Sequence, residues 1–351
     1  MFLLINETLE IPVSLKARLS VDCLLLSTKE YSMKNNLNKV FVGVDCHKDS
    51  IACYVNGKFK AFKTGFKGFK KALEWAGKDC YWALEGAYSY GLTFSMFLLD
   101  SGCKVYEFNA LSTAKARKAL SVDGTKNDMG DAKVISIFAN HTNLQEVSTK
   151  TVKLKQLLTK RKLLVVQRTQ ITNNLKSSFN QLGIIVPFKS FSTLKASKWF
   201  LNQDDICIRE FGKLLLSLNE SIKILEKEIE KLLPEQAKRL IAITGISTLT
   251  AGTIYAETKG KNMTKSQFAS YCGVAPVDCS SGQTQRHRNN HRGNRILNSI
   301  LYATAIHQIR YDKIGSEYYL KKLHEGKAKK VARKHLQRQL SNLIWKTLFT
   351  N

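Results

Sequence analysis

The stretch Val40-Phe-Val-Gly-Val-Asp-Cys-His-Lys48 decides how the first half of the chain is interpreted. A short apolar run ends there at Asp45, which is the pattern of a buried strand with a carboxylate at its end. A second apolar run, residues 81–84, ends in the same way at Glu85. A rigid sheet can aim such carboxylates into a common site, so we predict that the two acids lie in one site.

Two further acids follow in Lys126-Asn-Asp-Met-Gly-Asp-Ala132. Asp128 and Asp131 are three positions apart at the start of a predicted helix, and therefore share one face of it. Taken singly, Asp128 could also be a helix N-cap. His47 follows Asp45 closely, but we interpret a lone histidine there as a neighbour of the site. The predicted oxygen-rich metal site, suited to Mg²⁺, consists of Asp45, Glu85, Asp128 and Asp131.

The segments around these acids predict an α/β domain over residues 39–145. Asn56-Gly57 predicts a hairpin turn between two of its strands. We predict strands at 40–44, 50–55, 58–63, 81–84 and 104–108, and helices at 66–76 and 90–101. A strand and hairpin followed by helix, strand, helix and strand is the order of a ribonuclease-H-like sheet.

The rest of the chain predicts mainly helices. Residues 1–38 carry little pattern, and we interpret Met33 as the true start and the preceding segment as an extension. Residues 146–236 form a helical linker, in which apolar residues follow a heptad spacing at Phe211, Leu215, Leu218, Ile222, Leu225, Ile229 and Leu232. This helix and an earlier one, about 151–182, form either an intramolecular hairpin or a dimerising coiled coil. Residues 237–351 form a second basic unit, which opens with a helix, a tight turn at Gly245 and a second helix, a pattern that resembles a helix–hairpin–helix.

The composition favours a polyanionic partner. Lysine and arginine number 55 against 28 acidic residues, so the 351-residue chain has a net charge of +27, which points to DNA or RNA. No apolar run is long enough to span a membrane. Eight scattered cysteines without a Cys-x-x-Cys pair argue against a zinc ribbon and indicate reduced thiols in the cytoplasm. An acidic cluster in a basic chain therefore indicates metal-assisted chemistry on nucleic acid.

A second motif lies at Ser280-Ser-Gly282, and four arginines follow it. Serine attacks phosphate only when its proton is removed and the phosphate charge is neutralised, and arginine supplies that neutralisation. From the residues alone, a plain turn followed by a nonspecific phosphate-binding stretch is the simpler interpretation. The residues predicted to bind nucleic acid are Arg286, Arg288, Arg292 and Arg295, with Lys330 and Arg333 in a later basic helix that could also be a solvated face.

Together the motifs resemble the insertion-sequence 110 family, also called DEDD transposases or bridge-RNA-guided recombinases. The resemblance rests on Val42–Asp45, Glu85–Gly91, Lys126–Ala132, Gly273–Pro276, Ser280–Gly282 and Gly293–Leu297, in that order along the chain. Two positions depart from the family pattern. The turn Pro-Gly-Ile-Gly of the family is Thr244-Gly-Ile-Ser247 here, and a threonine of the family is Asn127.

The resemblance implies a RuvC-like domain at 39–145, a coiled-coil middle and a serine-bearing transposase domain at 237–351. It implies that Ser281, or else Ser280, attacks DNA to form a covalent link, and that the four carboxylates hold Mg²⁺. A structured noncoding guide RNA would choose donor and target DNA, and the protein would act as a dimer to tetramer. Two alternatives remain from the residues: a Holliday-junction-type metal-dependent nuclease, and a nucleic-acid-binding protein without catalysis.

Overall fold

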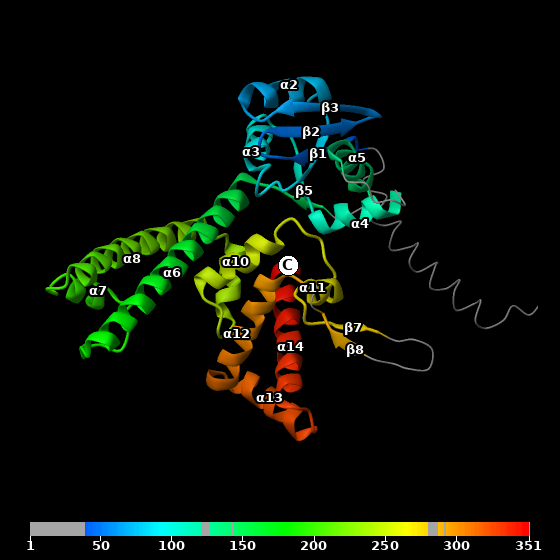
Figure 1. Cartoon of the computed structure of the whole chain (residues 1–351). Coiled ribbons are helices and arrows are strands. Elements are labelled where there is room, and N and C mark those ends of the chain that lie inside the picture. The colour runs from blue at the N-terminus through cyan, green and yellow to red at the C-terminus, as the bar shows by residue number, and fades with distance from the viewer. Residues whose placement is uncertain (1–38, 121–126, 142–143, 280–286, 291–292, 351) are drawn as a thin grey trace, which may run out of the picture. The chain divides into compact units, whose positions relative to one another are not determined.

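The structure is a computed structural model that describes residues 39–120, 127–141, 144–279, 287–290 and 293–350. The expected extension at 1–38 lies outside this part of the chain, as do Ser280, Ser281, Arg286 and Arg292. The chain folds into two compact units, of which the first ends at Val147 and the second begins at Ser148 (Figure 1). The second unit contains all but the first two residues of the expected segment 146–236 and the whole of 237–351, and the separation of these segments into two domains stays a prediction.

The first unit is built on a six-stranded sheet. Its strands are β1 (Phe41–Cys46), β2 (Ser50–Val55), β3 (Lys58–Lys63), β4 (Tyr81–Glu85), β5 (Val105–Phe108) and β6 (Gln145–Glu146), in the spatial order β3-β2-β1-β4-β5-β6. β2 and β3 are antiparallel to their neighbours, whereas β4 and β5 continue the sheet parallel to β1. This confirms the RuvC-like α/β fold.

The hairpin between β2 and β3 turns where the sequence predicts. Asn56 and Gly57 have φ angles of 48° and 79°, the left-handed values that a tight two-residue hairpin turn needs at both positions. Among the described elements of this unit, β6 and a helix, α4 (Ala110–Leu120), were not expected.

The two faces of the sheet are covered by different helices. Alternation along β1 places Phe41, Gly43 and Asp45 on one face, and this face packs against α5 (Asp128–Ala139). A Cβ atom at Gly43 would overlap the backbone of Ala132 and Ser136, so glycine lets α5 lie directly on the strand.

The opposite face packs against α2 (Phe66–Ala76) and α3 (Leu92–Asp100). There Trp82 of β4 meets Phe94 edge to face, with ring centroids 5.4 Å apart, and Phe94 contacts Phe69 of α2. The aromatic packing on one face fixes β4 against its helices, and it leaves the other face to α5 and the acids.

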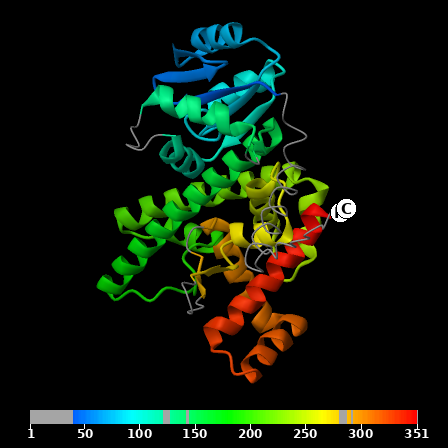
Figure 2. The same cartoon turned by 90° about the vertical axis from the view of Figure 1, so that its right-hand side faces the viewer.

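The second unit begins with a pair of long helices, α6 (Thr149–Leu182) and α8 (Ile206–Leu232), joined through α7 (Leu194–Phe200). The helices α6 and α8 run side by side in both views (Figures 1 and 2). The predicted seam of α8 is partly or fully buried along its length, and an ion pair of 2.6 Å joins Arg161 to Glu226 across the helices. The sequence left open an intramolecular hairpin or a dimerising coiled coil, and the structure has the intramolecular hairpin.

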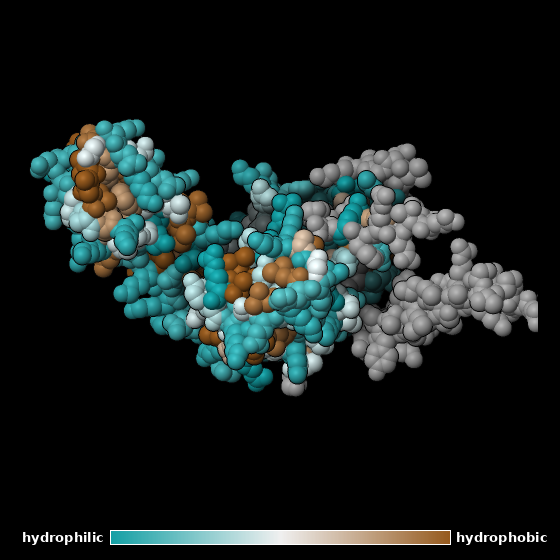
Figure 3. Space-filling model, turned by 90° about the horizontal axis from the view of Figure 1, so that it is seen from below, coloured by the Kyte–Doolittle hydropathy of each residue, from teal (hydrophilic) through white to brown (hydrophobic). Residues whose placement is uncertain are grey.

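The arm formed by α6, α7 and α8 also exposes apolar side chains. Figure 3 shows brown, apolar side chains among hydrophilic ones on this arm, at the left of the view. Ile185 and Leu182, at the end of α6, are 94% and 56% exposed. Part of this surface is therefore more apolar than folding of the single chain requires.

The remainder of the second unit is a helical bundle with a small hairpin. Its elements are α9 (Glu235–Lys238), η1 (Arg239–Ala242), α10 (Thr248–Thr258), α11 (Lys265–Tyr271), β7 (Pro276–Asp278), β8 (His287–Asn289), α12 (Arg295–Tyr311), α13 (Lys313–His324) and α14 (Lys329–Phe349). Buried apolar residues of α10, α11, α12 and α14 form one core. No helix in the described ranges is long and apolar enough to cross a membrane.

The helix–hairpin–helix expected around Gly245 is only partly correct. The segment before the turn is the short 3₁₀ helix η1 rather than a full helix, and Gly245 turns with a φ of 92°. Ser247 then caps α10 by accepting a hydrogen bond from the Thr250 backbone. The turn is held against α12, where the side chain of Gln308 donates to the Thr244 carbonyl.

Candidate metal centre

The ends of β1 and β4 place two carboxylates beside each other. Asp45 and Glu85 are direct partners in the parallel register of the two strands, so their side chains point to the same face of the sheet. Asp45 is only 7% exposed and Glu85 is half-buried. The shared site predicted for these two acids therefore has a structural basis at one edge of the sheet.

The start of α5 supplies the other two carboxylates from above the same face. Asn127 is the N-cap of this helix, and its side chain accepts a hydrogen bond from the Gly130 backbone. The alternative that Asp128 caps the helix is therefore wrong. Since Asn127 fills that role, the carboxylate of Asp128 is available to face the sheet.

His47 completes the cluster, although we interpreted it from sequence as a mere neighbour. Its Nε2 atom lies 3.1 Å from a carboxylate oxygen of Asp45 and 3.2 Å from one of Asp128. That nitrogen is shielded from solvent, and it makes no well-directed hydrogen bond to a described residue. One donor atom from each of the three residues lies within 4.8 Å of the others.

These three residues fit a divalent metal ion. Two carboxylate oxygens and one imidazole nitrogen converge, and this donor set suits several divalent first-row metals. A buried polar atom without a hydrogen bond needs a partner, and an ion between the carboxylates would provide one for the nitrogen. Among the described residues, this is the group of acids, histidines and cysteines close enough to share an ion.

The electrostatics of the cluster also favour a cation. Burial raises the pKa of Asp45, and the nearby carboxylates of Glu85, Asp131 and Asp128 raise it further, while His47 acts in the opposite direction. Negative groups this close repel one another unless positive charge lies between them. A bound divalent cation would remove that repulsion.

Asp131 differs from the other three acids because it has its own partner. The guanidinium of Arg117 on α4 donates two hydrogen bonds to it, of 2.6 and 2.8 Å. Asp131 is 3% exposed, so this is a largely buried, bidentate ion pair. No local motif marks Arg117 in the sequence, and only the packing of α4 against α5 brings it to the site.

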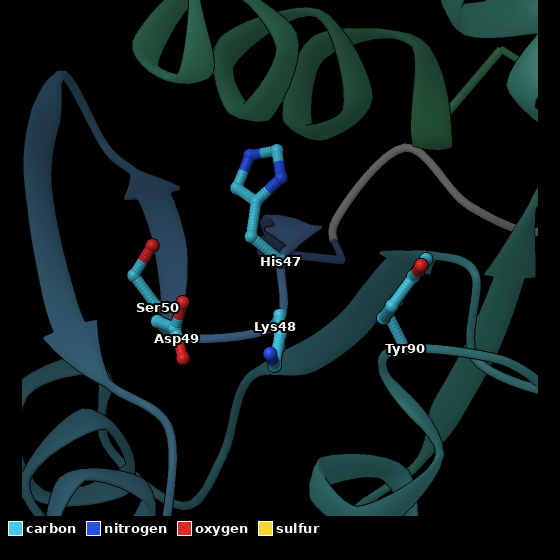
Figure 4. A pocket seen from close by; sticks show the side chains of 5 residues that line it. All are labelled: His47, Lys48, Asp49, Ser50 and Tyr90. Carbon is cyan, nitrogen blue, oxygen red and sulfur yellow. The ribbon is translucent and has the colours of Figure 1, made fainter.

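A hollow of about 440 Å³ adjoins the cluster, and His47, Lys48, Asp49, Ser50 and Tyr90 line it. Figure 4 shows the imidazole of His47 directed away from the side chains of Lys48, Asp49 and Ser50. The loop after β1 thus presents polar groups and both a basic residue, Lys48, and an acidic one, Asp49, beside the cluster.

In the second unit, the described members of the predicted nucleic-acid set lie on three elements. Arg288 is exposed on β8, Arg295 is the exposed first residue of α12, and Lys330 is exposed near the start of α14. Arg333 of α14 has its guanidinium carbon 4.6 Å from the ring centroid of Tyr302. The hairpin strands β7 and β8 flank the segment that carries Ser280 and Ser281.

Comparison with protein families agrees with this geometry. The DEDD transposase model of the IS110 family matches residues 42–184, and the model of the transposase IS116/IS110/IS902 family matches residues 237–320. The two matches together cover more than half of the chain, and the chain belongs to the IS110 family of transposases. No curated protein matched the chain in a sequence search.

Family membership gives the reaction class and the partner. The protein is an enzyme of DNA transposition, and DNA is its substrate. The first matched region contains all four carboxylates, and the second contains Ser280 and Ser281.

Proposed function

We propose that this transposase cuts and rejoins DNA with a divalent-metal centre at Asp45, Asp128 and His47 and with Ser281 as the nucleophile. The observation that carries the proposal is the convergence of the three donor atoms at the end of β1 and the start of α5. Glu85, the register partner of Asp45, extends the carboxylate set. Asp131, already bound by Arg117, orders the start of α5.

A divalent ion bound there would polarise the scissile phosphate and make a hydroxyl more acidic. The rigid strand β1 holds Asp45 in place and ends just before His47, and the cap at Asn127 fixes the direction in which α5 presents Asp128. Mg²⁺ remains our expected ion for an oxygen-rich site. The imidazole of His47, however, also suits Mn²⁺.

The proposed covalent step conserves one phosphodiester bond. The Ser281 oxygen attacks the DNA phosphorus, a serine–phosphate bond forms, and the bond to a sugar oxygen breaks. The proton of the serine passes to a carboxylate or to water, and the leaving sugar oxygen takes up a proton. Attack by the sugar hydroxyl of another strand reverses the step and rejoins DNA without ATP.

We also propose that a structured noncoding RNA guides the choice of DNA, and that several copies of the chain act together. The net charge of +27 supports binding to two kinds of nucleic acid at once. Base pairing by the RNA would then supply sequence choice, while the protein contacts backbones.

A covalent-trapping assay tests the proposal. The full chain, a divalent metal, RNA transcribed from the flank of the gene and labelled element-end DNA are mixed and run on a denaturing gel. We expect a protein–DNA adduct that disappears in Ser281→Ala and persists in Ser266→Ala, an exposed serine of α11. An adduct that persists in Ser281→Ala but disappears in Ser280→Ala would move the nucleophile to Ser280.

The Holliday-junction-type nuclease is a second candidate, because the described carboxylate cluster would suffice for hydrolysis by water. It predicts cleaved DNA without adduct, and cleavage that survives in Ser281→Ala. That result would replace the serine mechanism and leave the metal centre in place.

A further inference from the structure

A hollow of about 430 Å³ lies in the second unit. Arg295, Ser299 and Tyr302 line it from α12, and Gly273 and Gly293 line it from the loops before that helix. None of the described residues that line it is an aspartate or glutamate. The hollow therefore offers hydrogen-bond donors and an aromatic ring without a competing negative charge.

The spacing along α12 explains why its three side chains meet in one place. Arg295, Ser299 and Tyr302 occupy positions i, i+4 and i+7, which lie on one face of a helix. They span about 10 Å along the axis, a length that one nucleotide and an arginine side chain can bridge.

Two glycines keep the floor of the hollow free of side chains. A Cβ atom at Gly293 would lie 2.5 Å from the backbone nitrogen of Gly273, and Gly273 itself has a φ of 72°. The two backbones cross so closely that neither position accepts a larger residue. Backbone therefore forms part of the floor, and the polar side chains of the hollow come from α12 and from Asn290 before it.

Tyr302 is held ready for stacking. It is 46% exposed, and the guanidinium of Arg333 lies over its ring with 4.6 Å between the guanidinium carbon and the centroid. Such a cation–π contact fixes the orientation of the ring and adds positive charge beside it.

We propose that this hollow binds one unpaired nucleotide of a nucleic-acid strand, with the base stacked on Tyr302 and a phosphate bound by Arg295. Aromatic rings beside basic side chains bind single strands in this way, because every base presents a flat face and every linkage a charge. The proposal deepens the proposed function, since the strand would belong to the DNA or RNA of the transposase. It does not depend on the metal centre.

The test measures binding of short single strands by fluorescence anisotropy in EDTA, with the full chain. Poly-dT and poly-rU oligonucleotides serve as probes, and each is paired with an abasic strand of equal length. We expect Tyr302→Ala to weaken binding to the normal strands about tenfold and Tyr302→Phe to leave it nearly unchanged. On abasic strands, Tyr302→Ala should bind as well as the unmodified protein.

Tyr311→Ala is the matched control, because Tyr311 is a 70% exposed tyrosine at the other end of the same helix. A larger loss on one probe would identify the strand as DNA or RNA. Equal affinity of Tyr302→Ala and the unmodified protein for the normal strands would overturn the proposal. So would the same loss on abasic strands, or the same loss in Tyr311→Ala. Because the assay contains EDTA, no divalent ion at the metal centre takes part in binding, so failure here is separate from failure of the metal centre.

Discussion

Arg117 donates two hydrogen bonds to Asp131, and this ion pair joins α4 to the first turn of α5. The pair is largely buried: the side chains are 19% and 5% exposed. A buried carboxylate that loses its only charged partner is strongly destabilising, whereas removal of both partners costs less. The pair therefore contributes to the stability of the first unit and also holds the first turn of α5, which carries Asp128 and Asp131, in position.

We predict that Arg117→Ala lowers the free energy of unfolding by about 3 kcal/mol, measured by urea unfolding of the metal-free protein. The double variant Arg117→Ala/Asp131→Asn should recover part of that loss, because no buried charge is left unpaired. Lys118→Ala, an exposed lysine of the same helix, is the control and should change little. A loss no larger in Arg117→Ala than in Lys118→Ala would show that the pair does not matter.

Gly43 offers a second test, because it sets the distance between β1 and α5. A methyl group there would meet the backbone of Ala132 and Ser136, which has no flexible atoms that can move aside. We predict that Gly43→Ala costs about 3 kcal/mol or more of stability and weakens metal binding, since α5 carries Asp128 away from His47. A variant with unchanged melting temperature and metal affinity would contradict this packing.

The raised pKa of Asp45 gives a prediction about pH. Burial shifts it upward from its ordinary value of 3.8, so above that value the unfolded chain loses a proton that the folded chain retains. Stability of the metal-free protein should therefore fall as pH rises from about 4 through the folded-state pKa. Asp45→Asn removes the cost, and should melt higher than the unmodified protein in EDTA at neutral pH.

The advantage of Asp45→Asn should shrink below about pH 4, where the carboxyl is protonated in both states. Asp100→Asn, an exposed acid at the end of α3, serves as the control. If Asp45→Asn melted lower than the unmodified protein in EDTA at neutral pH, the carboxylate would be a stabilising group and not a strained one.

Because His47 offers an imidazole, we predict that the metal centre prefers some divalent ions over others. An imidazole ligand suits Mn²⁺ better than Mg²⁺, which prefers oxygen. We expect His47→Ala to weaken Mn²⁺ binding at least about tenfold and Mg²⁺ binding less. His47→Asp should restore Mg²⁺ binding. His141→Ala, at an exposed histidine after α5, should change the affinity for neither ion. Equal losses for the two ions would place His47 outside the metal's ligands.

The parts of the fold that local patterns determine could be predicted from the sequence. Asn56-Gly57 specifies its own hairpin, and apolar runs that end at Asp45 and Glu85 identify the strands that carry them. The pairing of those two acids follows from the parallel order of the strands. The seam of α8 indicates a long helix, but its intramolecular partner α6 depends on tertiary packing, so the sequence left a dimer equally open.

The parts of the site that were missed depend on contacts between distant segments. His47 becomes a potential ligand only because Gly43 lets α5 approach β1 and bring Asp128 near. Arg117 reaches Asp131 through the packing of α4, a helix that has no strong pattern of its own. The closeness of His47 to Asp45 in the sequence does not by itself distinguish a ligand from a neighbour, and Arg117 has no site residue near it in the sequence.

The most direct test of the metal centre is isothermal titration of the full chain with Mn²⁺. The account predicts saturable binding that Asp45→Asn and Asp128→Asn each abolish or weaken about a hundredfold, while Asp100→Asn binds normally. Circular dichroism would confirm that the variants are folded. Folded Asp45→Asn and Asp128→Asn proteins that bind Mn²⁺ as tightly as the unmodified chain would contradict the proposed centre.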